Sequence, residues 1–191
     1  MEELRTFIAL DSNIELKILL KDTIEKLNKM GFKANWTTTE NIHLTLLFLG
    51  DLSMHKIAEI AYKIGERISG FPTFIFDVNN LGFFESENSP KNFWFGVSGQ
   101  QTLHGLYKEI QKAVSLCEIE VQNEEFVPHI TVGRIKKYPE HWKKLISSID
   151  FETIKVPVNS VCIYSSTLTK KGPVYEKLYT IDFEGGVIIN G

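Results

Sequence analysis

The sequence of 191 residues is long enough for one domain or two closely packed halves, and its 43% hydrophobic and 24% charged content excludes a disordered or collagen-like chain. The formal net charge is -3, from 21 basic and 24 acidic residues. This balance excludes a protein that holds long nucleic acid through a basic surface, so any contact with nucleic acid is expected to be local.

Strand and helix patterns alternate along the first half of the chain. Short apolar runs bounded by turn residues indicate strands, and apolar residues at helical spacing, such as Leu16, Leu20 and Ile24, indicate helices. In chain order we expect a strand over 6–10, a helix from the cap at 11–13 to Gly31, a strand over 42–49, a helix from Ser53 to Gly70 and a strand over 74–81.

The second half repeats this order after a loop-like stretch. Residues 82–91 contain Ser86, Asn88 and Pro90, which favour turns, and we expect the boundary between the halves there. A turn at 170–173 between apolar runs predicts a carboxy-terminal hairpin over 160–183. The elements expected between these points are a strand over 92–97, a helix over 102–116, a strand over 129–135, a helix over 139–148 and a strand over 151–158.

The two halves align at a single offset of 86 residues. One shift that aligns four residue pairs in three separate elements indicates a duplicated unit, with pseudo-repeats over 5–81 and 92–158 in a single bilobal domain of residues 1–191. Duplicated units usually pack about a pseudo-two-fold axis, which would bring equivalent residues together across a central cleft. The equivalent pairs are Phe7 with Phe93, Leu20 with Leu106, Ile24 with Ile110, and His43 with His129.

Two predicted strands carry the same quartet, His-Leu-Thr-Leu at 43–46 and His-Ile-Thr-Val at 129–132. Because side chains alternate along a strand, the histidine and threonine of each quartet project from one face while the apolar residues enter the core. The five histidines of the chain would give less than one His-x-Thr triplet by chance. The matched pair favours a functional site over the alternative, a duplicated structural strand that kept its pattern without chemistry.

Two opposed imidazoles flanked by hydroxyls suit the displacement of a phosphodiester. A neutral histidine accepts the proton of the attacking oxygen, a charged histidine protonates the departing oxygen, and threonine hydroxyls bond the phosphoryl oxygens. An ordinary histidine pKa of about 6.5 lets both forms coexist near neutrality. The residues alone do not say which histidine is the acid. Two other functions stay open: a module that binds a nucleotide or RNA end without turnover, and a two-histidine metal hydrolase, although no metal ligands stand at a known spacing.

The quartets lie in two longer segments, at 40–50 and 126–134, which occur with Arg-Thr-Phe-Ile-Ala at 5–9 and Phe-Trp-Phe-Gly-Val at 93–97. In this order and spacing the chain resembles, over nearly its whole length, the 2H phosphoesterase superfamily. Within it, the chain is similar to the bacterial and archaeal RNA 2',3'-cyclic phosphodiesterases, also called RNA 2',5'-ligases. The resemblance implies an α+β fold of two antiparallel sheets flanked by helices, with both motifs in a central cleft.

The resemblance also implies an activity, the opening by water of a 2',3'-cyclic phosphate on an RNA end or nucleotide to leave a 2'-phosphate, with no metal and no cofactor. On this basis His43 is the proton donor to the 3'-oxygen and His129 is the proton acceptor that activates water. Thr45 and Thr131 would hold the phosphate. Run backwards with an RNA 5'-hydroxyl, the site would join ends through a 2',5' bond. Arg134 is a further candidate for phosphate binding, with a surface arginine paired to a carboxylate as the alternative.

Two positions depart from the family pattern by removing positive charge. Leu47 and Asn35 stand where the family often has lysine and arginine, so we expect weaker contact with RNA beyond the terminal nucleotide. Three aromatic residues, Trp36, Phe84 and Phe126, are candidates for stacking on a base, with core packing as the alternative.

Other features are interpreted as structural or as marks of location. The lysine pairs at 136–137 and 170–171 are expected to be solvated surface without a role in the site. Cys117 and Cys162 show no paired spacing and are expected to be reduced, buried thiols. The acidic start at 1–3 and the lack of a long apolar stretch favour a cytoplasmic protein that does not span a membrane, and we expect a monomer.

Overall fold

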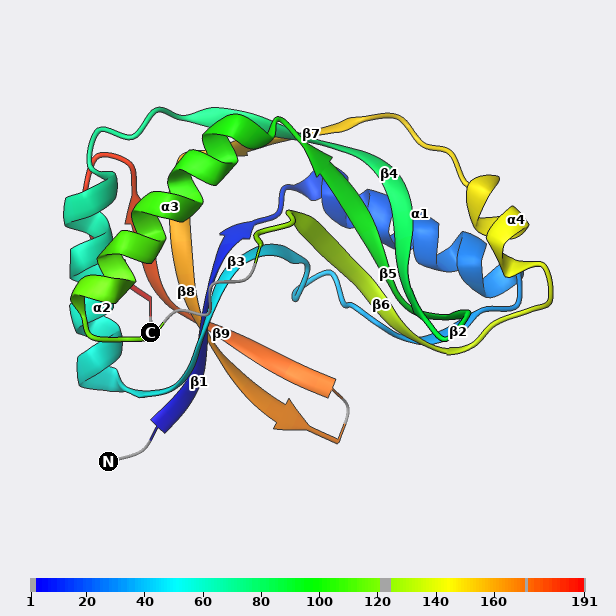
Figure 1. The fold of residues 1–191 in the computed structure, drawn as a ribbon, viewed down its shortest axis with the longest axis horizontal. Coiled ribbons are helices and arrows are strands. Elements are labelled where there is room, and N and C mark those ends of the chain that lie inside the picture. The colour runs from blue at the N-terminus through cyan, green and yellow to red at the C-terminus, as the bar shows by residue number, and fades with distance from the viewer. Residues whose placement is uncertain (1–2, 121–124, 171, 191) are drawn as a thin grey trace.

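The computed structural model describes residues 3–120, 125–170 and 172–190, and it contains two five-stranded antiparallel sheets flanked by helices (Figure 1). The predicted α+β class and the two-sheet arrangement are therefore confirmed. Residues 1–2 of the acidic start and Lys171 of the predicted turn lie outside the described residues. Among the described residues, no helix has the length and apolarity to cross a bilayer.

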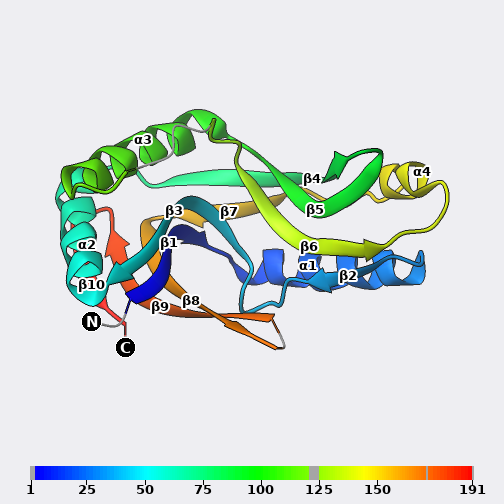
Figure 2. The ribbon, with the colours of Figure 1, turned by 60° about the horizontal axis from the view of Figure 1, so that its bottom comes forward.

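The first sheet has the strand order β10-β9-β8-β1-β3. The predicted carboxy-terminal hairpin is formed by β8 and β9, and its tip projects from the body of the molecule (Figure 1 and Figure 2). The short strand β10 was not predicted from the sequence. The strands of the first sheet are β1 (Glu3–Asp11), β3 (His43–Ser53), β8 (Ser160–Thr169), β9 (Gly172–Asp182) and β10 (Val187–Ile189).

The second sheet has the strand order β2-β6-β5-β4-β7. In both sheets the strand with the quartet pairs with the strand that carries the equivalent phenylalanine, β3 with β1 and β6 with β5. The strands of the second sheet are β2 (Lys33–Trp36), β4 (Phe74–Ser86), β5 (Ser89–Ser98), β6 (His129–Lys137) and β7 (Ile154–Val158).

The prediction of a loop over 82–91 is wrong. These residues belong to one long hairpin of β4 and β5, joined only by Glu87 and Asn88, which have positive φ values of 52° and 61°. The serine, asparagine and proline of this stretch belong to a tight turn and to the strand ends beside it, and not to a loop between the halves. Because β4 lies in the second sheet, the division of the chain at 82–91 does not coincide with the division between the sheets.

The helices exchange places between the two sheets. Helices α2 and α3 lie together against the first sheet, and α1 and α4 lie on the second (Figure 1 and Figure 2). Thus α1 follows β1 of the first sheet but packs on the second sheet. Helix α3 follows β5 of the second sheet but packs on the first. The helices are α1 (Ile14–Lys29), α2 (Met54–Ile68), α3 (Gln100–Leu116) and α4 (Trp142–Ser147).

Local sequence explains where the helices begin. The side chain of Asn13 accepts a hydrogen bond from the backbone N–H of Leu16 at 3.0 Å, so the cap predicted at 11–13 is confirmed. Ser53, where the second helix was predicted to begin, accepts from the N–H of Lys56 at 3.3 Å. Helix α4 is shorter than the predicted 139–148 because His141, at its amino-terminal end, has a left-handed backbone with φ of 58°.

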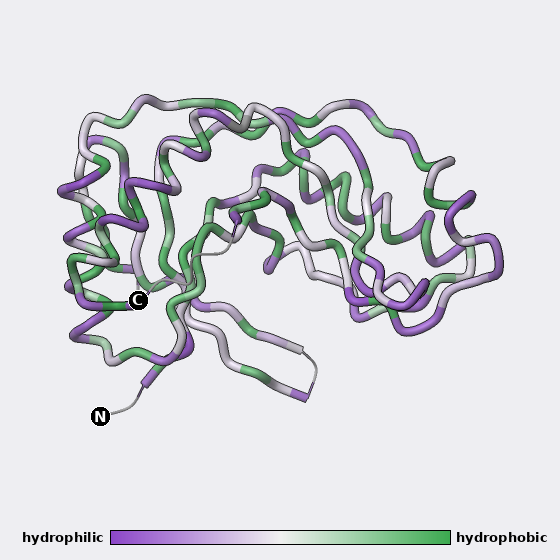
Figure 3. The backbone as a smooth tube through the Cα atoms, viewed as in Figure 1, coloured by the Kyte–Doolittle hydropathy of each residue, from purple (hydrophilic) through white to green (hydrophobic). Residues whose placement is uncertain are grey.

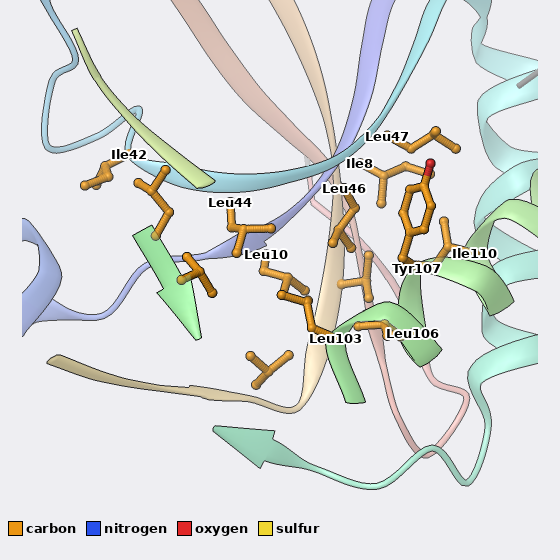
Figure 4. Packing of buried hydrophobic residues seen from close by; sticks show 14 of the residues in the cluster. Ile8, Leu10, Ile42, Leu44, Leu46, Leu47, Leu103, Leu106, Tyr107 and Ile110 are labelled. Carbon is orange, nitrogen blue, oxygen red and sulfur yellow. The ribbon is translucent and has the colours of Figure 1, made fainter. Parts of the chain in front are cut away.

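One continuous hydrophobic core connects the helices with both sheets. Leu44 and Leu46 of β3 point away from the quartet's polar face and pack with β1 against Leu103 and Leu106 of α3 (Figure 4). Along α2, hydrophilic residues follow the outer edge of the molecule while the hydrophobic ones turn inward (Figure 3). Cys117 and Cys162 are free and buried, as predicted.

Candidate functional site

The two quartets meet in one cavity of about 320 Å³. Strand β3 of the first sheet lies beside β6 of the second, so His43 and Thr45 share this cavity with His129 and Thr131. The structure therefore brings together the four residues that the sequence singled out. The cavity also takes in residues from β1, from the segment between β2 and β3, and from the β8–β9 hairpin.

A β-bulge follows each threonine. Residues 44, 46 and 47 of β3 are buried while Thr45 and Phe48 are not, and the pairing of β3 with β1 passes over residue 46. On β6, Val132 and Gly133 are both buried, Arg134 is exposed, and the pairing with β5 passes over residue 132. The extra residue shifts the alternation of side chains by one position. Residues 48 and 134 therefore lie on the same face of their strands as the histidine and threonine of each quartet.

The hydrogen bonds of His43 fix which nitrogen faces the cavity. Its Nδ1 lies 2.6 Å from the carbonyl oxygen of Asn41, and because a carbonyl only accepts, Nδ1 carries a proton. Nε2 lies 2.8 Å from the Thr45 hydroxyl and accepts from it when the ring is neutral. The proton that His43 can gain or lose is therefore the one on Nε2.

His129 is held in the same way. Its Nδ1 donates to the carbonyl oxygen of Val127 at 2.8 Å, again two residues before the histidine. Nε2 is thus the exchangeable nitrogen of both rings. Phe84, from the β4–β5 hairpin, packs edge-on against the His129 ring with 5.4 Å between ring centroids.

The surroundings of His43 are aromatic and largely buried. Phe7 packs at 4.9 Å and Tyr175 at 5.4 Å between ring centroids. Burial lowers the pKa of His43 below its ordinary value, while the Asn41 carbonyl and the Asp11 carboxylate oppose this shift. In the unliganded protein His43 consequently loses its Nε2 proton more readily than an exposed histidine does.

Asp11 is paired with His43 across the β1–β3 ladder and is itself held by two neighbours. Lys177 Nζ lies 2.5 Å from its carboxylate, and the Tyr164 hydroxyl donates to the same group. Burial raises the pKa of Asp11, but hydrogen bonds from Lys177 and Tyr164 outweigh it and hold the pKa below the ordinary value. Asp11 is therefore a fixed negative charge near His43.

A match to a family of known proteins agrees with this geometry. The 2'-5' RNA ligase superfamily matches the chain over residues 21–169, a span that contains both quartets. The chain belongs to the 2'-5' RNA ligase superfamily.

Curated relatives carry a consistent name. A protein of Thermotoga maritima named RNA 2',3'-cyclic phosphodiesterase is 49% identical over 185 residues, covering 97% of this chain and 98% of the relative. A protein of the same name from Aeropyrum pernix is 33% identical and covers 79% of this chain and 87% of its own.

Solved structures show the same fold. TT0787 of Thermus thermophilus superposes with a TM-score of 0.74 at 23% identity, covering 95% of this chain and 99% of that one. E. coli LigT complexed with 3'-AMP has a TM-score of 0.73 at 20% identity, covering 94% of this chain and 97% of that one.

The other residues of interest from the sequence do not all lie in the central cavity. Arg134 does not line the central cavity but stands in an adjoining groove, exposed, and no ion pair joins it to a carboxylate within the described residues. Arg5 does line the cavity. It belongs to the motif at 5–9 but was given no role from the sequence, because the position of β1 beside the quartet strand is a tertiary feature. Leu47 is 8% exposed and packs in the core.

The three aromatic candidates fall into different settings. Trp36 stacks on Phe93, at 6.1 Å between ring centroids, and its other surroundings form the groove that contains Arg134. Phe126 stacks on Tyr107 at 4.2 Å. Phe84 remains 42% exposed beside His129. Within the described part of the chain, no three His, Cys, Asp or Glu side chains are grouped as a metal site would require.

Proposed function

We propose that this protein hydrolyses the 2',3'-cyclic phosphate at RNA ends and on nucleotides to a 2'-phosphate, with His43 and His129 as its acid and base. The observation that carries the proposal is the convergence of two identically held histidines and two threonine hydroxyls on one cavity. Relatives named RNA 2',3'-cyclic phosphodiesterase at up to 49% identity support the reaction, and LigT complexed with 3'-AMP supports a nucleotide as ligand.

The proton movements follow from the two Nε2 atoms. Water attacks the phosphorus, the neutral histidine takes its proton, the bond from phosphorus to the 3'-oxygen breaks, and the charged histidine protonates that oxygen. The two rings end the cycle with exchanged protonation and return to the starting state through solvent. We assign the acid to His43 and the base to His129, with Thr45 and Thr131 on the phosphoryl oxygens. Bound phosphate favours the charged form of His43, which burial alone disfavours.

Ligation would open the same cyclic phosphate with the same groups. An RNA 5'-hydroxyl in place of water would attack the cyclic phosphate, and a 2',5' bond would form without a further energy source. The free state of Cys117 and Cys162 supports a reducing compartment, and we place the protein in the cytoplasm as a monomer.

The deciding experiment uses an oligoribonucleotide that ends in a 2',3'-cyclic phosphate, with a chelator present and the product identified by phosphorus NMR. The parent protein should release a 2'-phosphate, and His43→Ala and His129→Ala should each lose about 10²–10⁴-fold in rate. Thr45→Val and Thr131→Val should lose less, since each removes one hydroxyl and keeps the shape of the side chain.

Each variant's circular dichroism should match the parent, because His43 and His129 face a cavity and not the core. Binding without conversion in the parent protein would instead support the binding module. Loss of activity on chelation would support the metal hydrolase. Near-normal turnover by either alanine variant would overturn the two-histidine mechanism.

A further inference from the structure

The central cavity opens on one side into a groove that carries only positive charge. This basic groove, of about 760 Å³, is lined by Arg134, Lys136 and Lys170 together with Asn35 and Trp36. No carboxylate is among the residues that line it in the described chain. Three cations in one groove stand out in a protein whose formal net charge is -3.

Two sheets contribute to the basic groove. Arg134 and Lys136 are exposed on β6, two residues apart and therefore on one face, which the bulge after Thr131 turns outward. Lys170 comes from the tip of the β8–β9 hairpin. The Asn41 side chain donates a hydrogen bond of 2.8 Å to the carbonyl oxygen of Pro173, which holds that tip beside the cavity.

A close contact between β2 and β6 contributes to the lining of the basic groove. A Cβ atom on Gly133 would lie 2.7 Å from the Trp36 ring and 3.0 Å from the carbonyl oxygen of Asn35. Glycine at 133 therefore lets β2 and its tryptophan pack directly against β6. Trp36 lines the groove together with Arg134, and an aromatic ring in such a groove can stack with a base.

The opposite side of the cavity has the reverse charge. A second groove, of about 600 Å³, is lined by Glu120 and Glu125 and by the aromatic rings of Phe48, Phe84 and Phe126, with no lysine or arginine among its described lining residues. Phe48 is 71% exposed. The acidic, aromatic groove repels phosphates and the basic groove attracts them. The two sides of the cavity therefore differ in their electrostatic attraction for a nucleic-acid backbone.

We propose that the basic groove binds the phosphodiester backbone of the nucleotides that precede the cyclic phosphate, so that single-stranded RNA enters the active cavity from the side of Lys136 and Lys170. The inference rests on the proposed function and adds a subsite for an oligonucleotide. Neither lysine lines the central cavity, so a mononucleotide held there would not contact them, whereas the further phosphates of an oligomer would pass along the groove that they line. Oligomers should accordingly be preferred over 2',3'-cyclic AMP.

The test compares the two substrates in Lys136→Gln, Lys170→Gln and the double variant. For a short oligoribonucleotide with a 2',3'-cyclic phosphate, kcat/KM should fall about 2–5-fold for each lysine and multiplicatively in the double variant. For 2',3'-cyclic AMP, kcat/KM should stay at the parent value. Affinity for a fluorescent oligoribonucleotide ending in a 2'-phosphate should become less salt-dependent, by roughly 0.7 in the logarithmic slope for each lost phosphate contact.

A matched double variant, Lys21→Gln with Lys108→Gln, makes the same change in net charge on exposed faces of α1 and α3. It should leave both substrates and the salt slope unaffected. An equal loss with this control, or an equal loss on both substrates in the groove variants, would overturn the proposal. If the parent protein hydrolyses neither substrate, the proposed function fails, and the salt dependence of oligonucleotide binding still decides whether the groove holds RNA.

Discussion

His43 lies between opposing influences on its charge. Burial among Phe7, Tyr175 and the β-sheet disfavours the imidazolium form, and the carboxylate of Asp11 favours it. The Nζ of Lys177 lies 2.5 Å from that carboxylate and offsets much of its negative charge. The pKa of His43 therefore depends on how completely Lys177 compensates Asp11, and this gives two substitutions with opposite effects.

Asp11→Asn removes a negative charge and should lower the pKa of His43 further. Lys177→Gln leaves Asp11 less compensated and should raise it. Because we assign the acid to His43, which must be protonated, activity is lost as pH rises through its pKa. The alkaline limb of kcat/KM should move to lower pH in Asp11→Asn and to higher pH in Lys177→Gln. The pH profiles of both variants, measured beside the parent, check this.

A purely structural role for the Asp11–Lys177 pair would lower activity in both variants without moving the limb in opposite directions. Shifts on the acidic limb instead would mean that His43 is the base. Titration of the His43 ring by NMR in each variant gives the same answer without turnover, because the direction of its pKa shift is then observed directly.

At the scale of elements, the β4–β5 hairpin carries Phe84 to the edge of the His129 ring. Its two turn residues both have positive φ, the geometry of a type I′ turn, which asparagine and glycine tolerate and glutamate does not. Glu87→Asn should therefore raise the free energy of unfolding by about 0.5–1 kcal/mol, since a left-handed conformation costs most other residues roughly 1–2 kcal/mol. Urea denaturation measures the change.

Glu87→Ala is the matched control, because it removes the same charge without improving the turn. If the alanine variant gained as much stability as the asparagine variant, the gain would come from charge and not from backbone conformation. The activity of Glu87→Asn should equal that of the parent, since the side chain at 87 does not line the cavity.

The same hairpin shows why some elements could be predicted and others not. Thr6, Leu16 and Ile57 belong to clear local periods, and their strand and helices were predicted within a few residues. Between residues 82 and 91, turn residues were interpreted as a loop at the boundary between the halves, because local pattern does not distinguish a tight turn in a long hairpin from a longer loop. Strand β2, with only four residues, has too short a period to recognise.

The meeting of the two quartets in one cavity was predictable for a different reason. His43 and His129 repeat a motif at one offset, and duplication turns a sequence pattern into a prediction of proximity. Lys136 and Lys170 repeat nothing, so their convergence follows only from the meeting of β6 with the hairpin tip. Each lysine pair alone has the pattern of ordinary solvated surface, and net charge gives no information on where charges gather.

At the scale of the whole molecule, the exchange of α1 and α3 between the lobes ties the sheets together. Helix α1 follows a strand of the first sheet and packs on the second, where the Asn13 side chain donates to the carbonyl oxygen of Lys155 in β7 at 2.9 Å. One buried cluster includes Ile163 and Ile181 of the first sheet as well as Phe93 of the second. Helices α1 and α3 each follow a strand of one sheet and pack on the other sheet, so we expect the two lobes to unfold together.

The three tryptophans allow this to be measured, because Trp36, Trp94 and Trp142 all belong to the second sheet or to α4 beside it. Ile181→Val, in the first sheet, should lower the free energy of unfolding by about 0.5–1.5 kcal/mol. In urea it should shift the tryptophan fluorescence midpoint and the circular dichroism midpoint by the same amount, although no tryptophan lies near the substitution.

A fluorescence midpoint that stays at the parent value while circular dichroism shows an earlier phase would mean that the lobes unfold independently. The cleft between them would then form only after both lobes are folded, and a first-sheet variant would lose activity at urea concentrations where the second sheet is still intact.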